Sequence, residues 1–362
     1  MDIARRRLLA QHLVTPVLAT PADVVRTLGA VQAQDYSGAK WALAMRMRDA
    51  TDAAIDRAFD EGTILRTHVL RPTWHFVTPA DIRWLLALTG PRVKQAMMHY
   101  DRRLELDEPL YRRSRTVIVR ALRDGNHLTR TELRREIERA RIEIPGTQRL
   151  AHVIVRHELD AVICSGPRRG KQFTYALLDE RVPAAPSITR DEALLELTTR
   201  YFTTRGPATA NDFSWWSGLT VADAKRGIEM AGKALEREVI DGRTYWLVGG
   251  KSRRRIRTPL AHLLPNYDEY FIGFRDRSAI AGRVGSRDLV KGGTVLTPHV
   301  AIIDGQLVGA WKRTIAQSEV VIDLRLVAKV SVSERNALER ASRNYAQFLG
   351  LTAELRGTEV SR

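Results

Sequence analysis

The first 250 residues repeat one pattern three times: a group of helical segments followed by two short strand-like runs joined by a turn. In the first group, a helix is predicted to begin at Thr20, with Pro21 at its first helical position and Asp23 completing the cap. Two runs of strand character follow, over 63–70 and 73–77. No strong residue-level repeat accompanies the pattern. We therefore expect an α+β chain assembled from several small units.

The second group shows the pattern most clearly. Three helices are predicted between residues 115 and 159, and strands follow over 161–165 and 172–178. The turn between these strands, Gly166-Pro167-Arg168-Arg169-Gly170-Lys171, is basic and bordered by glycine. Three helices followed by such a hairpin are typical of a winged helix, with the basic turn as its wing.

The last third of the chain changes character. Runs over 299–303, 306–311 and 320–326 alternate or are β-branched, and a closing helix is expected over 333–349. This pattern indicates a small β-barrel covered by one helix. The expected domain limits are 1–100, 101–182, 187–250 and 251–362.

Basic residues exceed acidic ones, with 58 Lys and Arg against 42 Asp and Glu and a net charge of +16. This excess indicates a polyanionic partner, and nucleic acid fits better than a membrane surface. A GC-rich genome would explain why Arg replaces Lys, but not the net excess. The single cysteine, Cys164, excludes internal disulfide bonds and cysteine-based zinc sites.

No metal or nucleotide-cofactor motif is found, so we expect no cofactor. Nothing resembles a signal peptide, and no apolar run approaches the roughly 20 residues of a membrane span. We expect a cytoplasmic, nucleoid-associated monomer that does not bind a membrane.

Two glutamines, Gln32 and Gln34, lie between two helical patterns in the stretch Val31-Gln32-Ala33-Gln34-Asp35. In an extended segment, residues i and i+2 point to the same side, so both amides can be aimed in one direction. On spacing alone, solvated or capping glutamines are the simpler interpretation. The neighbouring motifs change that balance.

Six stretches, in order and along almost the whole chain, resemble the AlkZ/YcaQ family of winged-helix DNA glycosylases. They are Val31–Asp35, Leu70-Arg71-Pro72-Thr73-Trp74-His75-Phe76, Ser165–Gln172, Arg205–Thr209 with Asp212–Leu219, Leu264–Arg277 and Gly305–Trp311. The resemblance implies three tandem winged helices followed by a C-terminal β-barrel. It also implies excision of N7-alkylated purines from DNA, including interstrand crosslinks. Because Gln34 occupies the second motif position, the chain resembles the AlkZ-like branch rather than the YcaQ-like branch, which has an acidic residue there.

Glycoside cleavage commonly uses a carboxylic acid and a carboxylate, and glutamine is neither. A purine alkylated at N7 is already cationic, however, and departs as a neutral base without protonation. We therefore expect Gln32 and Gln34 to be catalytic, holding a water and stabilising charge on the sugar. Asp35 is considered as an electrostatic aid, and Tyr36 as packing. Lys40 is expected to be solvated, so the enzyme is predicted to be monofunctional, without a lyase step.

Five residues are expected to contact DNA. Arg168, Arg169 and Lys171 would grip phosphates from the wing, and the alternative is a solvated basic turn. Thr73 and His75 alternate on one strand and share a side. His75 is predicted to hydrogen-bond DNA near the lesion, and a structural histidine is the alternative.

A different class of function is also compatible with this sequence: a non-enzymatic winged-helix DNA-binding protein such as a transcriptional regulator. Asp268 and Glu269 are expected to be structural carboxylates bound to Arg275 or Arg277. Trp215 and Trp216 are both expected to be packed in the core or between units.

Overall fold

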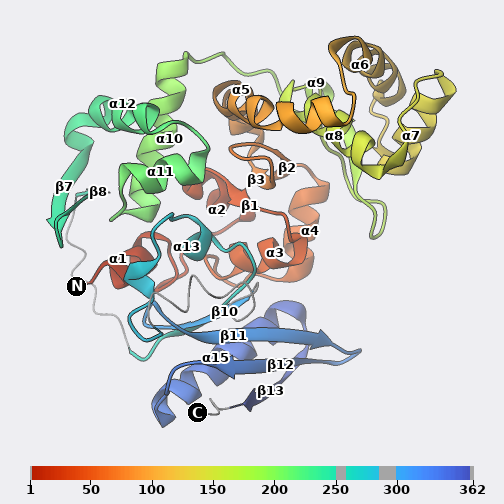
Figure 1. Ribbon diagram of the computed structural model, residues 1–362. Coiled ribbons are helices and arrows are strands. Elements are labelled where there is room, and N and C mark those ends of the chain that lie inside the picture. Colours follow the sequence, from red (N-terminus) through yellow and green to blue (C-terminus); the bar gives the residue numbers. More distant parts are fainter. Residues whose placement is uncertain (1, 250–257, 285–298, 359–362) are drawn as a thin grey trace.

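The structure, a computed structural model, describes residues 2–249, 258–284 and 299–358. Before residue 250, three groups of elements follow one order: a helix, a short strand or bridge, two helices and two antiparallel strands (Figure 1). The first group is α2 (Pro21–Leu28), β1 (Val31–Gln32), α3 (Tyr36–Ala44), α4 (Asp52–Asp60), β2 (Leu65–His68) and β3 (Trp74–Val77). The second group is α6 (Glu108–Leu122), β4 (Leu128–Thr129), α7 (Arg130–Arg139), α8 (Gly146–Leu159), β5 (Ile163–Ser165) and β6 (Thr174–Leu177).

The third group has a single bridge, Ala208 with Trp246, where the others have a short strand. Its elements are α10 (Arg190–Arg205), α11 (Ala210–Ser217), α12 (Val221–Ala231), the 3-10 turn η1 (Gly232–Ala234), β7 (Leu235–Ile240) and β8 (Arg243–Val248). The first two sheets have equivalent orders, β1-β3-β2 and β4-β6-β5, so the first strand of each lies beside the last. The connecting helices are α1 (Ile3–Ala10), α5 (Pro79–Arg103) and α9 (Leu178–Arg181).

Helix starts follow the sequence closely. The predicted capping box of Thr20 and Asp23 is present, with the Thr20 hydroxyl accepting from the Asp23 N–H at 3.1 Å and the Asp23 carboxylate reaching back. Such a box satisfies backbone N–H groups that the first helical turn leaves without partners.

The C-terminal part is one curled five-stranded sheet covered by a helix. Its elements are β9 (Ala261–Leu264), α13 (Glu269–Ile272), the 3-10 turn η2 (Ser278–Ile280), β10 (Val300–Ile303), β11 (Gln306–Ile315), β12 (Glu319–Leu326), α15 (Val332–Leu349) and β13 (Thr352–Thr358). The strand order is β13-β12-β11-β10-β9. Among the described strands the sheet is therefore open, a half-barrel rather than the predicted barrel. Helix α15 packs against both edge strands, β9 and β13, and fills the space that closure would occupy.

Apolar side chains form three cores. Helices α1 to α4 share one core with the C-terminal sheet, and α5 with β2 shares a second with the third group. The second group, α6 to β6, has a core of its own. The predicted domain limits stay a prediction.

Candidate active site at the glutamine pair

Strand pairing brings Gln32 and His75 to one face of a small sheet, with Gln34 and Thr73 just beyond the strand ends. Strand β1 pairs with β3 so that Gln32 lies directly opposite His75. Opposed residues of an antiparallel pair point to the same face, with Cβ atoms about 5 Å apart. The Ala33 N–H donates to Trp74 O at 2.7 Å, so the pairing continues one residue further. Gln34 and Thr73 lie next to this pairing, in bends just beyond the ends of β1 and β3.

Gln32 is held from two sides. Its backbone N–H donates to Glu269 Oε1 at 2.9 Å, and its side-chain Oε1 accepts from Arg71 Nη2 at 2.8 Å. A guanidinium is only a donor, so the amide oxygen must face Arg71 and the NH2 group must point away. The side chain is 5% exposed. Its amide therefore has one defined orientation.

Gln34 is exposed, in contrast to Gln32. Its Oε1 accepts from the Trp74 backbone N–H at 3.3 Å, a longer and weaker contact. The pair thus combines one amide fixed inside the protein with one that solvent or a ligand can reach.

His75 is completely buried, and its Nδ1 lies 2.9 Å from Thr73 O. Burial first, and then the Arg71 guanidinium, keep the pKa of His75 well below its ordinary value. The imidazole is therefore neutral, and because a carbonyl only accepts, its proton is on Nδ1. His75 Nε2 and Thr73 Oγ1 are buried without a hydrogen-bond partner in the part of the chain that the structure describes. Unsatisfied polar atoms thus adjoin Gln32.

Glu269 anchors the motif from the C-terminal part of the chain. Its Oε2 accepts from Arg205 Nη2 at 2.6 Å and from Trp216 Nε1 at 2.8 Å, and all three residues are fully buried. Asp268 forms a buried bidentate pair with Arg46 at 2.9 and 3.0 Å. The structural role predicted for the two carboxylates is confirmed, but the predicted partners were wrong, because the pairing is long-range.

A family model for AlkZ-like DNA glycosylases matches residues 25–348. The chain belongs to this family. A curated relative from Streptomyces sahachiroi, named "Interstrand DNA cross-link repair glycosylase", is 25% identical over 356 residues, which cover 93% of this chain and 94% of the relative. The solved structure of Streptomyces sahachiroi DNA glycosylase AlkZ has the same fold, with a TM-score of 0.81, 21% identity and 98% coverage of both chains.

Arg66 is a further residue in contact with the glutamine motif, and sequence reasoning missed it. Its Nε donates to Ala33 O at 3.0 Å, between the two glutamines. The guanidinium lies over the rings of Trp74, at 4.2 Å, and Phe173, at 4.8 Å. Arg66 thereby ties the glutamine loop to the wing of the second group. An Arg within an alternating strand gives no local signal of this role.

Asp35, Tyr36 and Lys40 all have local partners. Asp35 Oδ1 accepts from the Gly38 N–H at 3.1 Å and so caps α3. Tyr36 packs edge-on against three phenylalanine rings, which agrees with its predicted packing role. Lys40 is buried and its Nζ lies 2.7 Å from Asp52 and 2.9 Å from Asp56, so the predicted solvated lysine was wrong.

The three wing residues differ in their surroundings. Arg168 is partly buried, donates to both Asp60 oxygens and lies 2.8 Å from Asp56, which joins the wing to α4. Arg169 is exposed, and it donates to Glu132 at 2.8 Å and lowers the pKa of that carboxyl to about 2. Lys171 is exposed. DNA contacts by these residues stay predictions.

The two adjacent tryptophans differ in their exposure to solvent. Trp216 is fully buried, as expected, but Trp215 is 45% exposed, so the prediction that both are packed was wrong for Trp215. Adjacent residues on a helix point in different directions, and α11 buries only the face that carries Trp216.

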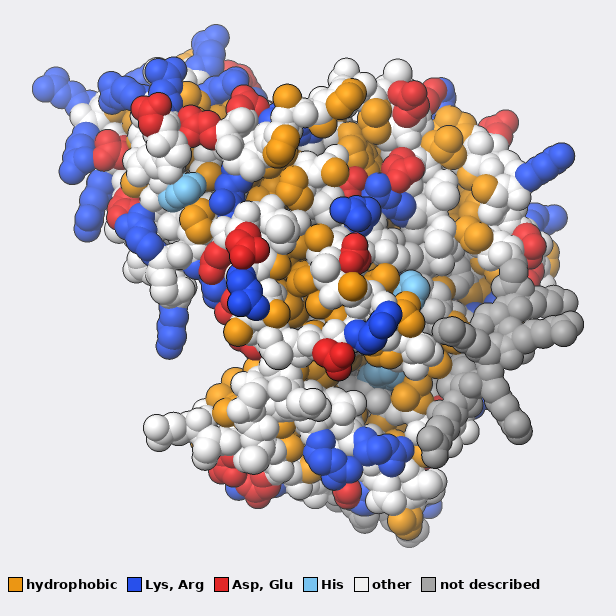
Figure 2. Space-filling view, turned by 180° about the vertical axis from the view of Figure 1, so that it is seen from behind, with side chains coloured by type: hydrophobic (Ala, Val, Ile, Leu, Met, Phe, Trp, Pro, Cys, Tyr) orange, Lys and Arg blue, Asp and Glu red, His pale blue; other side chains and the backbone are white. Residues whose placement is uncertain are grey.

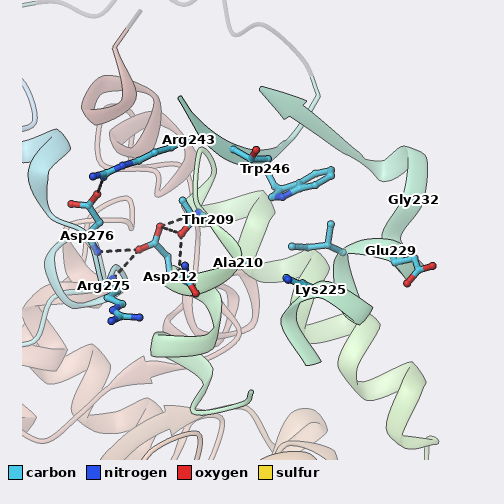
Figure 3. Close-up of a pocket in the computed structure, with 13 residues that line it drawn as sticks. Thr209, Ala210, Asp212, Lys225, Glu229, Gly232, Arg243, Trp246, Arg275 and Asp276 are labelled. Carbon is cyan, nitrogen blue, oxygen red and sulfur yellow. Dashed lines mark hydrogen bonds and ion pairs between the residues drawn. The ribbon is translucent and has the colours of Figure 1, made fainter. Parts of the chain in front are cut away.

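A cavity of about 1120 Å³ lies away from the glutamines, between α11, α12, β8 and residues 275–276 (Figure 3). Trp246 and Lys225 line it together with an ion pair of Arg243 and Asp276. Gln32 and Gln34 are absent from its lining. In the described part of the chain, no cluster of three or more His, Cys, Asp or Glu is placed to hold a metal, and no helix could span a membrane.

Proposed function

We propose that this AlkZ-like glycosylase hydrolyses the N-glycosidic bond of N7-alkylated purines in double-stranded DNA and unhooks interstrand crosslinks. Gln32 and Gln34 position the attacking water. The observation that supports the proposal is the fixed backbone of the Gln32–Gln34 segment, which Glu269, Arg66 and Trp74 hold by hydrogen bonds next to the Gln34 side-chain contact.

Two neutral amides suit this substrate. The N7-alkylated base carries its own positive charge and leaves as a neutral molecule, so no general acid is required. The sugar develops oxocarbenium character, which preorganised amide dipoles stabilise. Arg71 occupies one lone pair of Gln32 Oε1, and the second remains available for a water hydrogen. The exposed Gln34 side chain supplies the second contact to this water. Asp35 acts through its charge at the start of α3.

DNA binding is part of the proposal. We assign winged helices to the three helix–hairpin groups, supported by their common element order, and contacts to DNA to Thr73, Arg168, Arg169 and Lys171. The DNA contact predicted for His75 is not assigned, because its side chain is completely buried. Figure 2 shows Lys and Arg side chains gathered on the lobe that α6 to α8 form, beside a hollow above the C-terminal sheet. The exposed arginines of that lobe include Arg112, Arg113, Arg115, Arg120, Arg123, Arg135, Arg139 and Arg141.

The proposed enzyme is a monofunctional, cofactor-independent monomer that acts on nucleoid DNA. Lys40 is the lysine nearest the motif in sequence, and two carboxylates bind its ammonium. The ammonium is buried and held in place by these two carboxylates, so it is not presented to a bound sugar. No strand cleavage and no borohydride-trapped adduct are therefore expected.

The test is base release from defined DNA. Purified protein is incubated with a duplex carrying 7-methylguanine and with a native crosslink, and free base and heat-labile abasic sites are measured. The wild type should release base. Gln32→Ala/Gln34→Ala should lower the rate at least about 100-fold while DNA affinity is retained. Wild-type protein that binds DNA without releasing base would instead identify a non-enzymatic DNA-binding protein.

A further inference from the structure

Arg71 stands at the tip of the turn between β2 and β3, beside Gln32. The turn is tight: the Arg71 N–H donates to Val69 O at 2.7 Å, and the Thr73 N–H donates to Arg71 O at 2.6 Å. Leu70 has a φ of +63°, a backbone conformation that residues other than glycine rarely adopt. The turn therefore presents Arg71 in a fixed position.

Among the residues that the structure describes, the Arg71 guanidinium has no anionic hydrogen-bond partner. Its hydrogen bond to Gln32 Oε1 uses one of five N–H groups, and its Nε is buried without a partner in the described part of the chain. No described carboxylate forms an ion pair with it. Glu269 acts on it electrostatically, but that carboxylate is already bound by Arg205.

A largely buried cation with one neutral acceptor is incomplete in energetic terms. Unsatisfied N–H groups lose their hydration without replacement, and a desolvated charge needs a counter-charge. Burial lowers the pKa of Arg71, the charge of Glu269 offsets part of that shift, and the cations Arg277 and Arg205 lower the pKa further. A phosphate oxygen would supply both the charge and the missing acceptor, and guanidinium groups bind phosphate in a fork geometry.

We propose that Arg71 binds a backbone phosphate of the damaged strand while its Nη2 stays on Gln32 Oε1. This inference rests on the proposed function. It gives Arg71 a contact with DNA, a role that the sequence motifs did not predict. One guanidinium then joins the DNA backbone to the catalytic amide. DNA binding and the orientation of Gln32 become coupled, so a misplaced phosphate would also misplace the amide.

Two measurements separate this proposal from the glycosylase assignment. The first is the affinity for undamaged duplex at several salt concentrations, which needs no catalysis. Arg71→Ala should weaken binding by on the order of tenfold and reduce the salt slope by about one. Arg237→Ala is the matched control, because Arg237 is an exposed arginine on β7, distant from β1 in Figure 1, and should change neither.

The second measurement is single-turnover release of 7-methylguanine at saturating DNA. Arg71→Lys keeps the charge and the salt slope but not the fork, so the rate should fall about tenfold. In a Gln32→Ala background the same change should have no further effect, because Arg71 acts on the rate through Gln32. A purely structural role would lower the melting temperature and leave the salt slope unchanged.

The outcomes are distinct. An unchanged salt slope in Arg71→Ala overturns the phosphate contact, and a wild-type rate in Arg71→Lys overturns the coupling. If Arg71→Ala does not fold, Arg71→Gln takes its place in the salt titration. Absence of base release by the wild type would refute the proposed function, and the salt titration would still decide the phosphate contact.

Discussion

Gln32 and Gln34 are chemically identical side chains with different tasks, and their surroundings set the difference. Gln32 is fixed by Arg71 and Glu269, whereas Gln34 is exposed and held by one long contact. A water between them would meet one rigid and one adjustable acceptor. The imidazole of His75, which lies opposite Gln32, is neutral.

The pH dependence of the enzyme follows from His75. Its folded-state pKa lies well below the unfolded value of 6.5, so its contribution to stability is complete above pH 6.5 and is lost as the pH falls below it. We expect the excision rate at saturating DNA to be flat from about pH 8 to 6.5. Below that range the melting temperature should fall, and less steeply in His75→Gln. A one-proton step in rate near pH 6.5, absent from His75→Gln, would contradict the assignment of a neutral imidazole.

Short elements close together in sequence were predictable, and their tertiary partners were not. The strands at Gln32 and His75 were predictable from alternation, but Gln34 and Thr73 lie in bends just beyond the strand ends, so their predicted shared sides stay predictions. The register of β1 against β3 places Gln32 opposite His75, and no local sequence pattern predicts that register. Lys40 was predicted to be solvated because its carboxylate partners lie on the next helix. The C-terminal barrel was predicted with the covering helix but without β13, and the contact of α15 with both edge strands has no local sequence signal.

The end of α11 supports the turn that carries Arg71. Gly218 has a φ of +71°, and a Cβ there would lie 2.1 Å from Leu70 O. Gly218→Ala should therefore destabilise the protein by about 1–3 kcal/mol and slow base release by moving Arg71. Gly350→Ala is the matched control, since Gly350 ends α15 with the same φ and has open space around it. It should cost stability without slowing base release, as measured by thermal melting and single-turnover kinetics. Equal base-release rates in the two variants would show that the contact does not support the site.

At the scale of the whole molecule, buried ion pairs connect parts that are distant in sequence. Arg46 and Asp268 are 222 residues apart, and neither is exposed. Arg205 and Glu269 join the third group to the C-terminal part. Removing one partner of such a pair leaves an uncompensated buried charge. The glutamine motif therefore depends on the assembled chain rather than on the first helix–hairpin group alone.

The wing of the second group packs against α4 and is also proposed to bind DNA. Different wing residues serve these two roles. Arg168 is paired with Asp56 and Asp60 of α4, whereas Lys171 is exposed. Arg168→Ala should lower stability by about 1–2 kcal/mol, because Asp60 loses its ion pair and Asp56 keeps only the one with Lys40. Lys171→Ala should leave stability within about 0.5 kcal/mol and reduce the salt slope of DNA binding by about one.

Thermal melting and salt-dependent DNA titration of both variants test this division of roles. Arg169→Ala is the intermediate case, because Arg169 is exposed but bound to Glu132. A reduced salt slope for Arg168→Ala with unchanged stability would show that Arg168 exchanges its carboxylates for phosphate when DNA binds. In that case the wing would move away from α4 on binding, because Arg168 cannot keep both aspartates and also grip the backbone.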